Sequence, residues 1–92
     1  MRKIMFPKAE KNEVKGRLKE TGRIVTTRVS KDFGRFKAGE RLEYGGFLLK
    51  VVDVKSFENL SEHPFLGELD DRMRKEIERF GEFDVVWMVV VE

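Results

Sequence analysis

The residues best suited to chemistry lie in the stretch RIVTTRVS, at positions 23–30. Thr26 and Arg28 are two positions apart, so in an extended strand their side chains point to the same face. An arginine between valines is costly to bury unless a carboxylate or an anionic ligand lies beside it. Three interpretations therefore stay open. The pair binds an anion such as a phosphate, this face of the sheet is open to water, or Arg28 forms an ion pair with a Glu or Asp from the second half of the chain.

Basic residues are concentrated in the first half of the chain. Residues 1–50 carry fourteen Lys or Arg against six Asp or Glu, a net of +8, and residues 51–92 carry five against eleven, a net of −6. Such a density of cations suits phosphates, because neutralising them releases condensed counterions. Phe33 and Phe36 lie among these cations, as in surfaces on which single-stranded nucleic acids stack. The alternative is a solvated basic surface with both phenylalanines in the core. The candidate nucleic-acid-binding cations are Lys15, Lys19, Arg23, Arg28, Lys31, Arg35 and Lys37.

A second group of reactive side chains surrounds the single histidine, His63, which lies near Glu62 and Glu68. His63 could act as a general base oriented by Glu68, although a histidine before a proline more often caps a helix or lies in a loop. The chain has no cysteine, which excludes disulfides, thiolate metal sites and thiol nucleophiles. It has no P-loop, dinucleotide-binding fingerprint or serine elbow. We expect neither a metal nor a cofactor.

The length of 92 residues suits one domain with one core, which we place at residues 1–92. Charged residues make up 39% of the chain, against a typical ~25%, and this ionic composition is typical of thermostable proteins. No window approaches the ~18 apolar residues of a membrane-spanning helix. We therefore expect a cytoplasmic protein that does not contact a membrane, and we favour a monomer.

The pattern of apolar residues predicts the elements that must position these side chains. We expect helices at 8–21 and from Ser61–Pro64 to Phe80, with Leu66, Leu69, Met73, Ile77 and Phe80 as the inward stripe of the second. We expect strands at 2–6, 23–30, 41–44, 47–55 and 83–91, with Gly45-Gly46 as a hairpin turn. The strand FDVVWMVVV must be covered on both faces or closed into a barrel. The fold class is therefore α+β, a small barrel of mostly antiparallel strands with two main helices.

The run TGRIVTTRVS followed by FKAGERLEY resembles the core signature of the ASCH family, which belongs to the PUA-like superfamily. Thr26 and Arg28 take the places of the family threonine and arginine, and Arg23 takes the place of the family lysine. The family glycine falls on Thr21, with Gly22 one position late. The segment 36–40 matches the basic-x-x-Gly-acid part of the signature. The likeness spans residues 13–91 and is to a small stand-alone member of archaeal or bacterial type.

This resemblance implies a PUA-like β-barrel of about five to six strands, beside which a cleft accommodates RNA or a nucleotide-like molecule. Some ASCH proteins deacetylate N4-acetylcytidine with the motif lysine, the threonine and a glutamate from the helical segment. Arg23 does not lose its proton in proteins and cannot replace that lysine as a base or nucleophile. We therefore expect binding of RNA or a nucleotide in a cation-lined cleft around RIVTTR. The alternative is an amidohydrolase of acylated nucleosides, with Thr26 and either Glu62 or Glu68 as catalytic residues, so whether the protein is an enzyme stays open.

Overall fold

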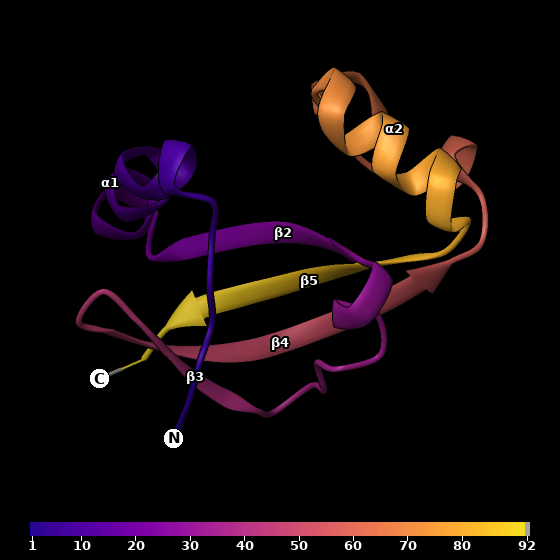
Figure 1. The fold of residues 1–92 in the computed structure, drawn as a ribbon. Helices are drawn as coiled ribbons and strands as arrows, with labels where there is room; N and C mark the ends of the chain where they lie inside the picture. The colour runs from indigo at the N-terminus through magenta and orange to yellow at the C-terminus, as the bar shows by residue number, and fades with distance from the viewer. Residues whose placement is uncertain (92) are drawn as a thin grey trace.

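A five-stranded sheet forms the centre of the computed structural model, which describes residues 1–91 (Figure 1). The order across the sheet is β1-β3-β4-β5-β2. The strands are β1 (Arg2–Lys3), β2 (Arg23–Val29), β3 (Arg41–Tyr44), β4 (Phe47–Phe57) and β5 (Phe83–Val90). All neighbouring pairs are antiparallel except β1 with β3, which is parallel. The expected α+β class with mostly antiparallel strands is therefore confirmed.

Two α-helices, α1 (Lys11–Thr21) and α2 (Asp71–Phe80), lie over opposite ends of β2 (Figure 1). α1 follows a 3₁₀ turn at Lys8–Glu10 and ends at Gly22, whose φ of 68° is the left-handed cap expected from the sequence. The expected start of the second helix at Ser61–Pro64 is wrong. The chain there makes two 3₁₀ turns, Leu60–Glu62 and Leu66–Glu68. α2 begins only after Asp70, whose side chain accepts the Met73 N–H at 2.8 Å as an N-cap.

The strand β5, between β4 and β2, has buried residues on both faces, and its Trp87, Val89 and Val90 are half-buried. On one face Val86 and Met88 pack in a core cluster with Val14 and Leu18 of α1. On the other face Phe83 and Val85 pack against Ile77 of α2, which is 1% exposed. Leu69 and Met73 join this second cluster as half-buried residues. Phe80, which we expected to point inward, is 42% exposed and lies under the guanidinium of Arg79.

The sheet is open rather than closed, with β1 and β2 at its two edges in the part of the chain described. The expected closed barrel is therefore not formed by these residues. The apolar faces of β5 are covered instead by the two helices and by the N-terminal segment, where Ile4 is 3% exposed. β1 has only two residues and is too short to reach around to β2. None of the described helices is long and apolar enough to cross a membrane.

Candidate ligand-binding cleft

A cleft of about 580 Å³ lies along the edge strand β2, between α1 on one side and the 3₁₀ turns and α2 on the other. Six consecutive residues of β2, positions 24–29, line it. Side chains from both faces of the strand are present, so the cleft follows the strand edge. Apolar wall residues include Phe6 and Val14 on the α1 side and Leu69 and Met73 on the α2 side. This volume is within the ~300–1,000 Å³ typical of small-ligand sites.

The backbone of β2 presents open donor–acceptor pairs at the edge that the cleft follows. Val90 N–H donates to the Gly22 carbonyl at 2.8 Å, so Gly22 is a hydrogen-bonded partner of β5. In an antiparallel ladder such pairs alternate, so Thr26 and Arg28 bond β5 through their backbones. Val25 and Thr27 then direct their N–H and C=O groups to the open edge, about 7 Å apart. This feature was missed from the sequence because it depends on the order of strands in the sheet.

His63 joins the α2 side of the cleft to β2. Its Nδ1 accepts the Phe65 N–H at 2.9 Å, so the ring proton is on Nε2, which donates to Thr27 Oγ1 at 2.8 Å. The ring is 5% exposed and stacks on Phe83 with centroids 5.2 Å apart. Burial lowers the pKa of His63. A neutral imidazole that already donates through Nε2 cannot remove a proton from Thr27, so the histidine positions the wall and is not a general base here.

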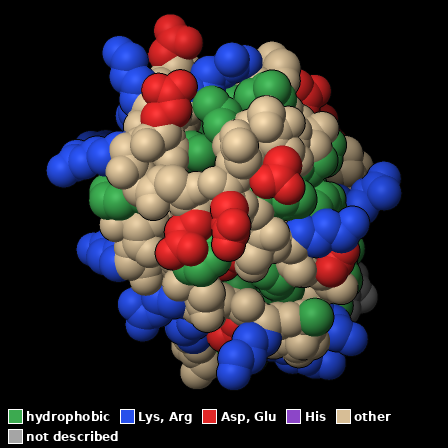
Figure 2. All heavy atoms as spheres, turned by 90° about the vertical axis from the view of Figure 1, so that its right-hand side faces the viewer, with side chains coloured by type: hydrophobic (Ala, Val, Ile, Leu, Met, Phe, Trp, Pro, Cys, Tyr) green, Lys and Arg blue, Asp and Glu red, His purple; other side chains and the backbone are tan. Residues whose placement is uncertain are grey.

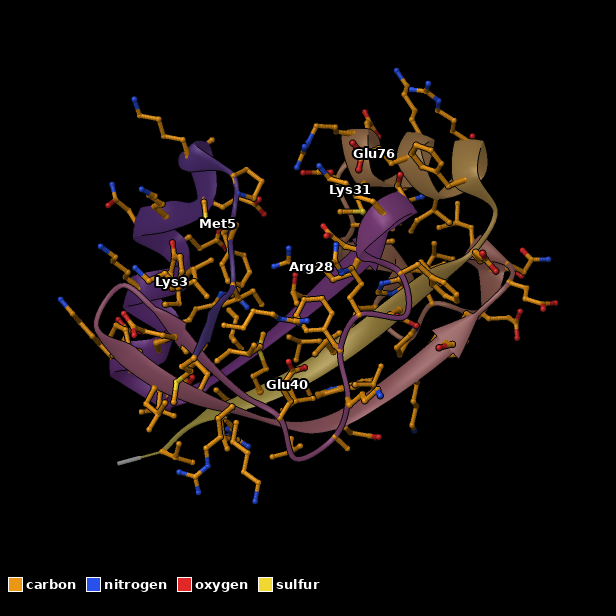
Figure 3. The ribbon with its side chains drawn as sticks, turned by 60° about the horizontal axis from the view of Figure 1, so that its bottom comes forward. Lys3, Met5, Arg28, Lys31, Glu40 and Glu76 are labelled. Atoms are coloured by element: carbon orange, nitrogen blue, oxygen red, sulfur yellow. The ribbon has the colours of Figure 1, made fainter. Side chains whose placement is uncertain are left out.

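Arg28 is packed between aromatic rings and holds the N-terminal segment. Its Nη2 donates to the Met5 carbonyl at 2.8 Å, and its guanidinium lies 4.8 Å from the Phe6 ring centroid and 5.5 Å from that of Phe36. Its side chain is 11% exposed, and Asp32, at 3.9 Å, is the one carboxylate within 4 Å of it in the described chain. Figure 3 shows Arg28 between the segment that carries Met5 and the turn that carries Lys31. Desolvation lowers the pKa of Arg28, opposed by Asp32 and Glu10.

The charge of Arg28 is therefore only partly compensated. Its Nε–H is buried without a partner among the described residues, and its closest carboxylate is at a long 3.9 Å. The interpretation of Arg28 as fully paired with an acidic residue from the second half is wrong, because Asp32 belongs to the first half and the contact is weak. What remains exposed of the guanidinium lines the cleft. It favours an electronegative ligand atom there.

Carboxylates outnumber cations around the rest of the cleft. The lining cations are Arg17, Arg28 and Arg72. The lining carboxylates are those of Glu10, Glu13, Asp32, Glu68, Asp70 and Glu76. Arg17 pairs with Glu13 at 3.2 Å and Arg72 with Glu10 at 3.8 Å, which removes part of the positive charge. The expectation of a cation-lined cleft is therefore wrong, because carboxylates outnumber cations in the lining. A run of phosphates would be repelled from it.

The structure brings together three of the predicted site residues, Thr26, Arg28 and Glu68, which all line the cleft. Arg23 does not join them. It lies three positions before Thr26 and five before Arg28, and these odd spacings put its side chain on the opposite face of β2. The register agrees, because Arg23 pairs with Val89 and Arg28 with Asp84. Val89 and Asp84 are on opposite faces of β5. Arg23 is outside the lining of the cleft.

The other predicted residues also lie outside the cleft. Glu62 lines a separate hollow of about 300 Å³ with Glu58 and Glu82. Figure 2, which faces the right-hand side of Figure 1, shows acidic side chains gathered in the middle of that side. The Lys15 side chain lies against the β3–β4 turn, where its Cε is 2.7 Å from the position a Cβ would take on Gly45. The remaining cations, Lys19, Lys31, Arg35 and Lys37, are exposed and do not line the cleft.

Comparison with protein-family models, with curated proteins and with solved structures finds no match to this chain. The resemblance to the ASCH family therefore rests on the sequence itself, above all on residues 21–30 and 36–44. Among residues 1–91, no group of three His, Cys, Asp or Glu side chains is arranged to hold a metal ion. The polar groups that the cleft offers to a ligand are thus the backbone edge of β2, the Thr and Arg side chains and the carboxylates.

Proposed function

We propose that this domain binds RNA or a nucleotide-like molecule and that a single nucleobase occupies the cleft. The observation that carries the proposal is the open edge of β2 on the cleft floor, where Val25 and Thr27 each offer an N–H and a C=O. A nucleobase presents its own donors and acceptors along one planar edge, which such a strand edge can match. The apolar side chains of Phe6 and Met73 suit the flat faces of the base.

The charges of the cleft support a base rather than a phosphate chain in this position. Carboxylates accept hydrogen bonds from exocyclic amino groups, as Asp and Glu do from cytosine N4. Glu68 is exposed at the cleft, and it is one of the two glutamates, with Glu62, that the family resemblance leaves as candidates. The phosphates lie outside, where the exposed cations of the first half can neutralise them. On this proposal the chain is a small ASCH member with a PUA-like fold whose barrel is open between β1 and β2.

A second candidate function is hydrolysis of an acylated nucleoside, and one observation favours it. Thr26 and Glu68 share the cleft, whereas Glu62 does not. In such a reaction water would add to the acyl carbon, the C–N bond would break, and the carboxylic acid and the free amine would leave. However, Arg23 is outside the cleft and His63 already donates its Nε2 proton to Thr27. The Thr26 hydroxyl forms no hydrogen bond with a base among the described residues, whereas activation of such a hydroxyl needs one. Binding is therefore the better supported function.

The test compares two glutamates of the same segment. Binding of labelled single-stranded RNA octamers and of single nucleosides is measured for the native protein, Glu68→Gln and Glu62→Gln. We expect Glu68→Gln to weaken binding of amino-bearing bases about tenfold, as for loss of one good base contact, while Glu62→Gln binds like the native protein. Absence of binding at low ionic strength, or equal effects of the two variants, would overturn the proposal.

A further inference from the structure

Trp87 lies in the middle of β5 on the face of the sheet that α2 covers at one end. Its cross-strand neighbours are Val25 on β2 and Asp53 on β4. Val25 is 39% exposed, and Val52, beside the irregularity in β4, is 48% exposed. Trp87 itself is only half-buried. This end of the face is therefore accessible to a partner.

The accessible face is continuous with the cleft. Phe65 lines the cleft, is 36% exposed and has its ring centroid 6.3 Å from that of Trp87. Val25 also belongs to both surfaces. Lys55 Nζ lies 5.7 Å from the centroid of the Trp87 ring. An aromatic pair with an adjacent cation thus extends from the mouth of the cleft onto the sheet.

Three cations form a row across this face at the level of Val89, two residues after Trp87 on β5. Arg41 on β3 is directly opposite Lys50 on β4, Lys50 is opposite Val89, and Val89 is opposite Arg23 on β2. None of the three forms an ion pair with another described residue. Like charges directly opposite each other on neighbouring strands destabilise a sheet, and an anion placed between them removes that repulsion.

We propose that this surface, formed by Trp87, Phe65, Arg23, Arg41, Lys50 and Lys55, binds the nucleotides that adjoin the base in the cleft. One base stacks on the aromatic pair, and the phosphates follow the cation row. The two carboxylates on the same face, Asp53 and Glu43, are fewer than its four cations, which is the reverse of the balance in the cleft. The inference rests on the proposed function, because it assumes that the ligand is single-stranded RNA.

Trp87 is the only tryptophan of the chain, so its fluorescence reports on this surface directly. The probes are a single-stranded RNA octamer and a nucleoside monophosphate. We expect the octamer, and not the monophosphate, to quench Trp87. We expect Trp87→Leu to weaken octamer binding about tenfold, as for loss of one stacked base, with little change for the monophosphate.

Charge reversal separates a binding role from a structural one. Lys50→Glu places a carboxylate opposite Arg41, so the thermal midpoint of unfolding should stay equal or rise. The slope of the logarithm of the octamer binding constant against the logarithm of the salt concentration should decrease in magnitude by about 0.7. Lys75→Glu is the matched control, because Lys75 is exposed on α2 and outside both surfaces. We expect this control to retain the native slope.

The outcomes distinguish the two proposals. If the octamer binds without quenching Trp87, and Lys50→Glu behaves like Lys75→Glu, the surface is not part of the site although the proposed function stands. If neither probe binds, the proposed function and this inference both fail. If sedimentation shows that the protein dimerises and that Trp87→Leu abolishes the dimer, the face is a contact between copies, and the inference is overturned.

Discussion

Replacement of Thr27 by valine removes the hydrogen bond that fixes the α2 side of the cleft to β2. Valine preserves the size of the side chain and its preference for a strand. His63 Nε2–H then loses its acceptor at 2.8 Å, and the ring cannot turn to a new one because Nδ1 holds the Phe65 N–H at 2.9 Å. The imidazole is 5% exposed, so water does not readily replace the hydroxyl.

The expected cost follows from this burial. A buried donor left without a partner costs about 1–3 kcal/mol, and the added methyl group of valine returns part of this on a half-buried site. We therefore expect the free energy of unfolding to fall by about 1–2 kcal/mol. In a domain of this size each kcal/mol lowers the melting temperature by about 4–8 °C. The change is large enough to measure against a total stability of about 5–15 kcal/mol.

The assay is urea denaturation of the native protein and three variants. Thr27→Ser keeps the hydroxyl and should lose less than Thr27→Val. Thr26→Val is the matched control, because Thr26 is half-buried on the same strand and its hydroxyl makes no hydrogen bond to a described residue. We expect that control to stay within about 0.5 kcal/mol of the native protein.

Two results would refute this reasoning. One is a Thr27→Val variant as stable as the control, which would mean that the hydroxyl does not satisfy His63. The other comes from nitrogen NMR of the imidazole. The hydrogen bonds require the proton on Nε2, so a spectrum showing the proton on Nδ1 would remove the basis for the calculation.

Three further predictions concern stability. Burial lowers the pKa of His63, so as the pH falls the unfolded chain binds a proton at this imidazole before the folded chain does. The unfolding free energy should therefore decrease as the pH falls from about 7 through about 6.5. Denaturation series at several pH values should show a shallower dependence of the unfolding free energy on pH for His63→Asn. Ile77→Ala should cost about 2–5 kcal/mol at a site 1% exposed, while Phe80→Ala at a site 42% exposed should cost far less; equal losses in chemical denaturation would contradict the packing of α2. Gly45→Ala should cost about 1–2 kcal/mol for its φ of 55°, and the same loss in a Lys15→Ala background would show that the backbone, and not the contact with Lys15, is responsible.

The elements predicted correctly are those with local signals in the sequence. The Gly45-Gly46 turn has φ values of 55° and 89°, which glycine adopts without strain, and the strands on either side pair in register. The start of α2 was wrong because the apolar spacing continues back to Leu66 while the backbone does not. Gly67 and the Asp70 cap divide that stripe between a 3₁₀ turn and the helix. A hydrophobic period alone does not determine where a helix begins.

The site was predicted only in part, because its character depends on helix faces and strand order. Strand alternation correctly placed Thr26 and Arg28 on one face. The net charge of the first half misled us about the cleft, since α1 sorts its charges by face. Glu13 and Arg17 line the cleft, whereas Lys15 and Lys19, in the same helix, do not. A count of charges along the chain cannot make that distinction.

On the proposed function, the opposite charges of the two surfaces limit how a nucleotide chain can lie on this domain. Six carboxylates along the cleft exclude a path in which phosphates follow β2 from end to end. A base that enters the cleft must therefore leave the stack of its own strand, and this costs least when that strand is single. The stacking on Trp87 and Phe65 at the cleft mouth would return part of this cost to the neighbouring base. The arrangement of the two surfaces thus favours an unpaired, flexible strand over a duplex, independently of which base is read.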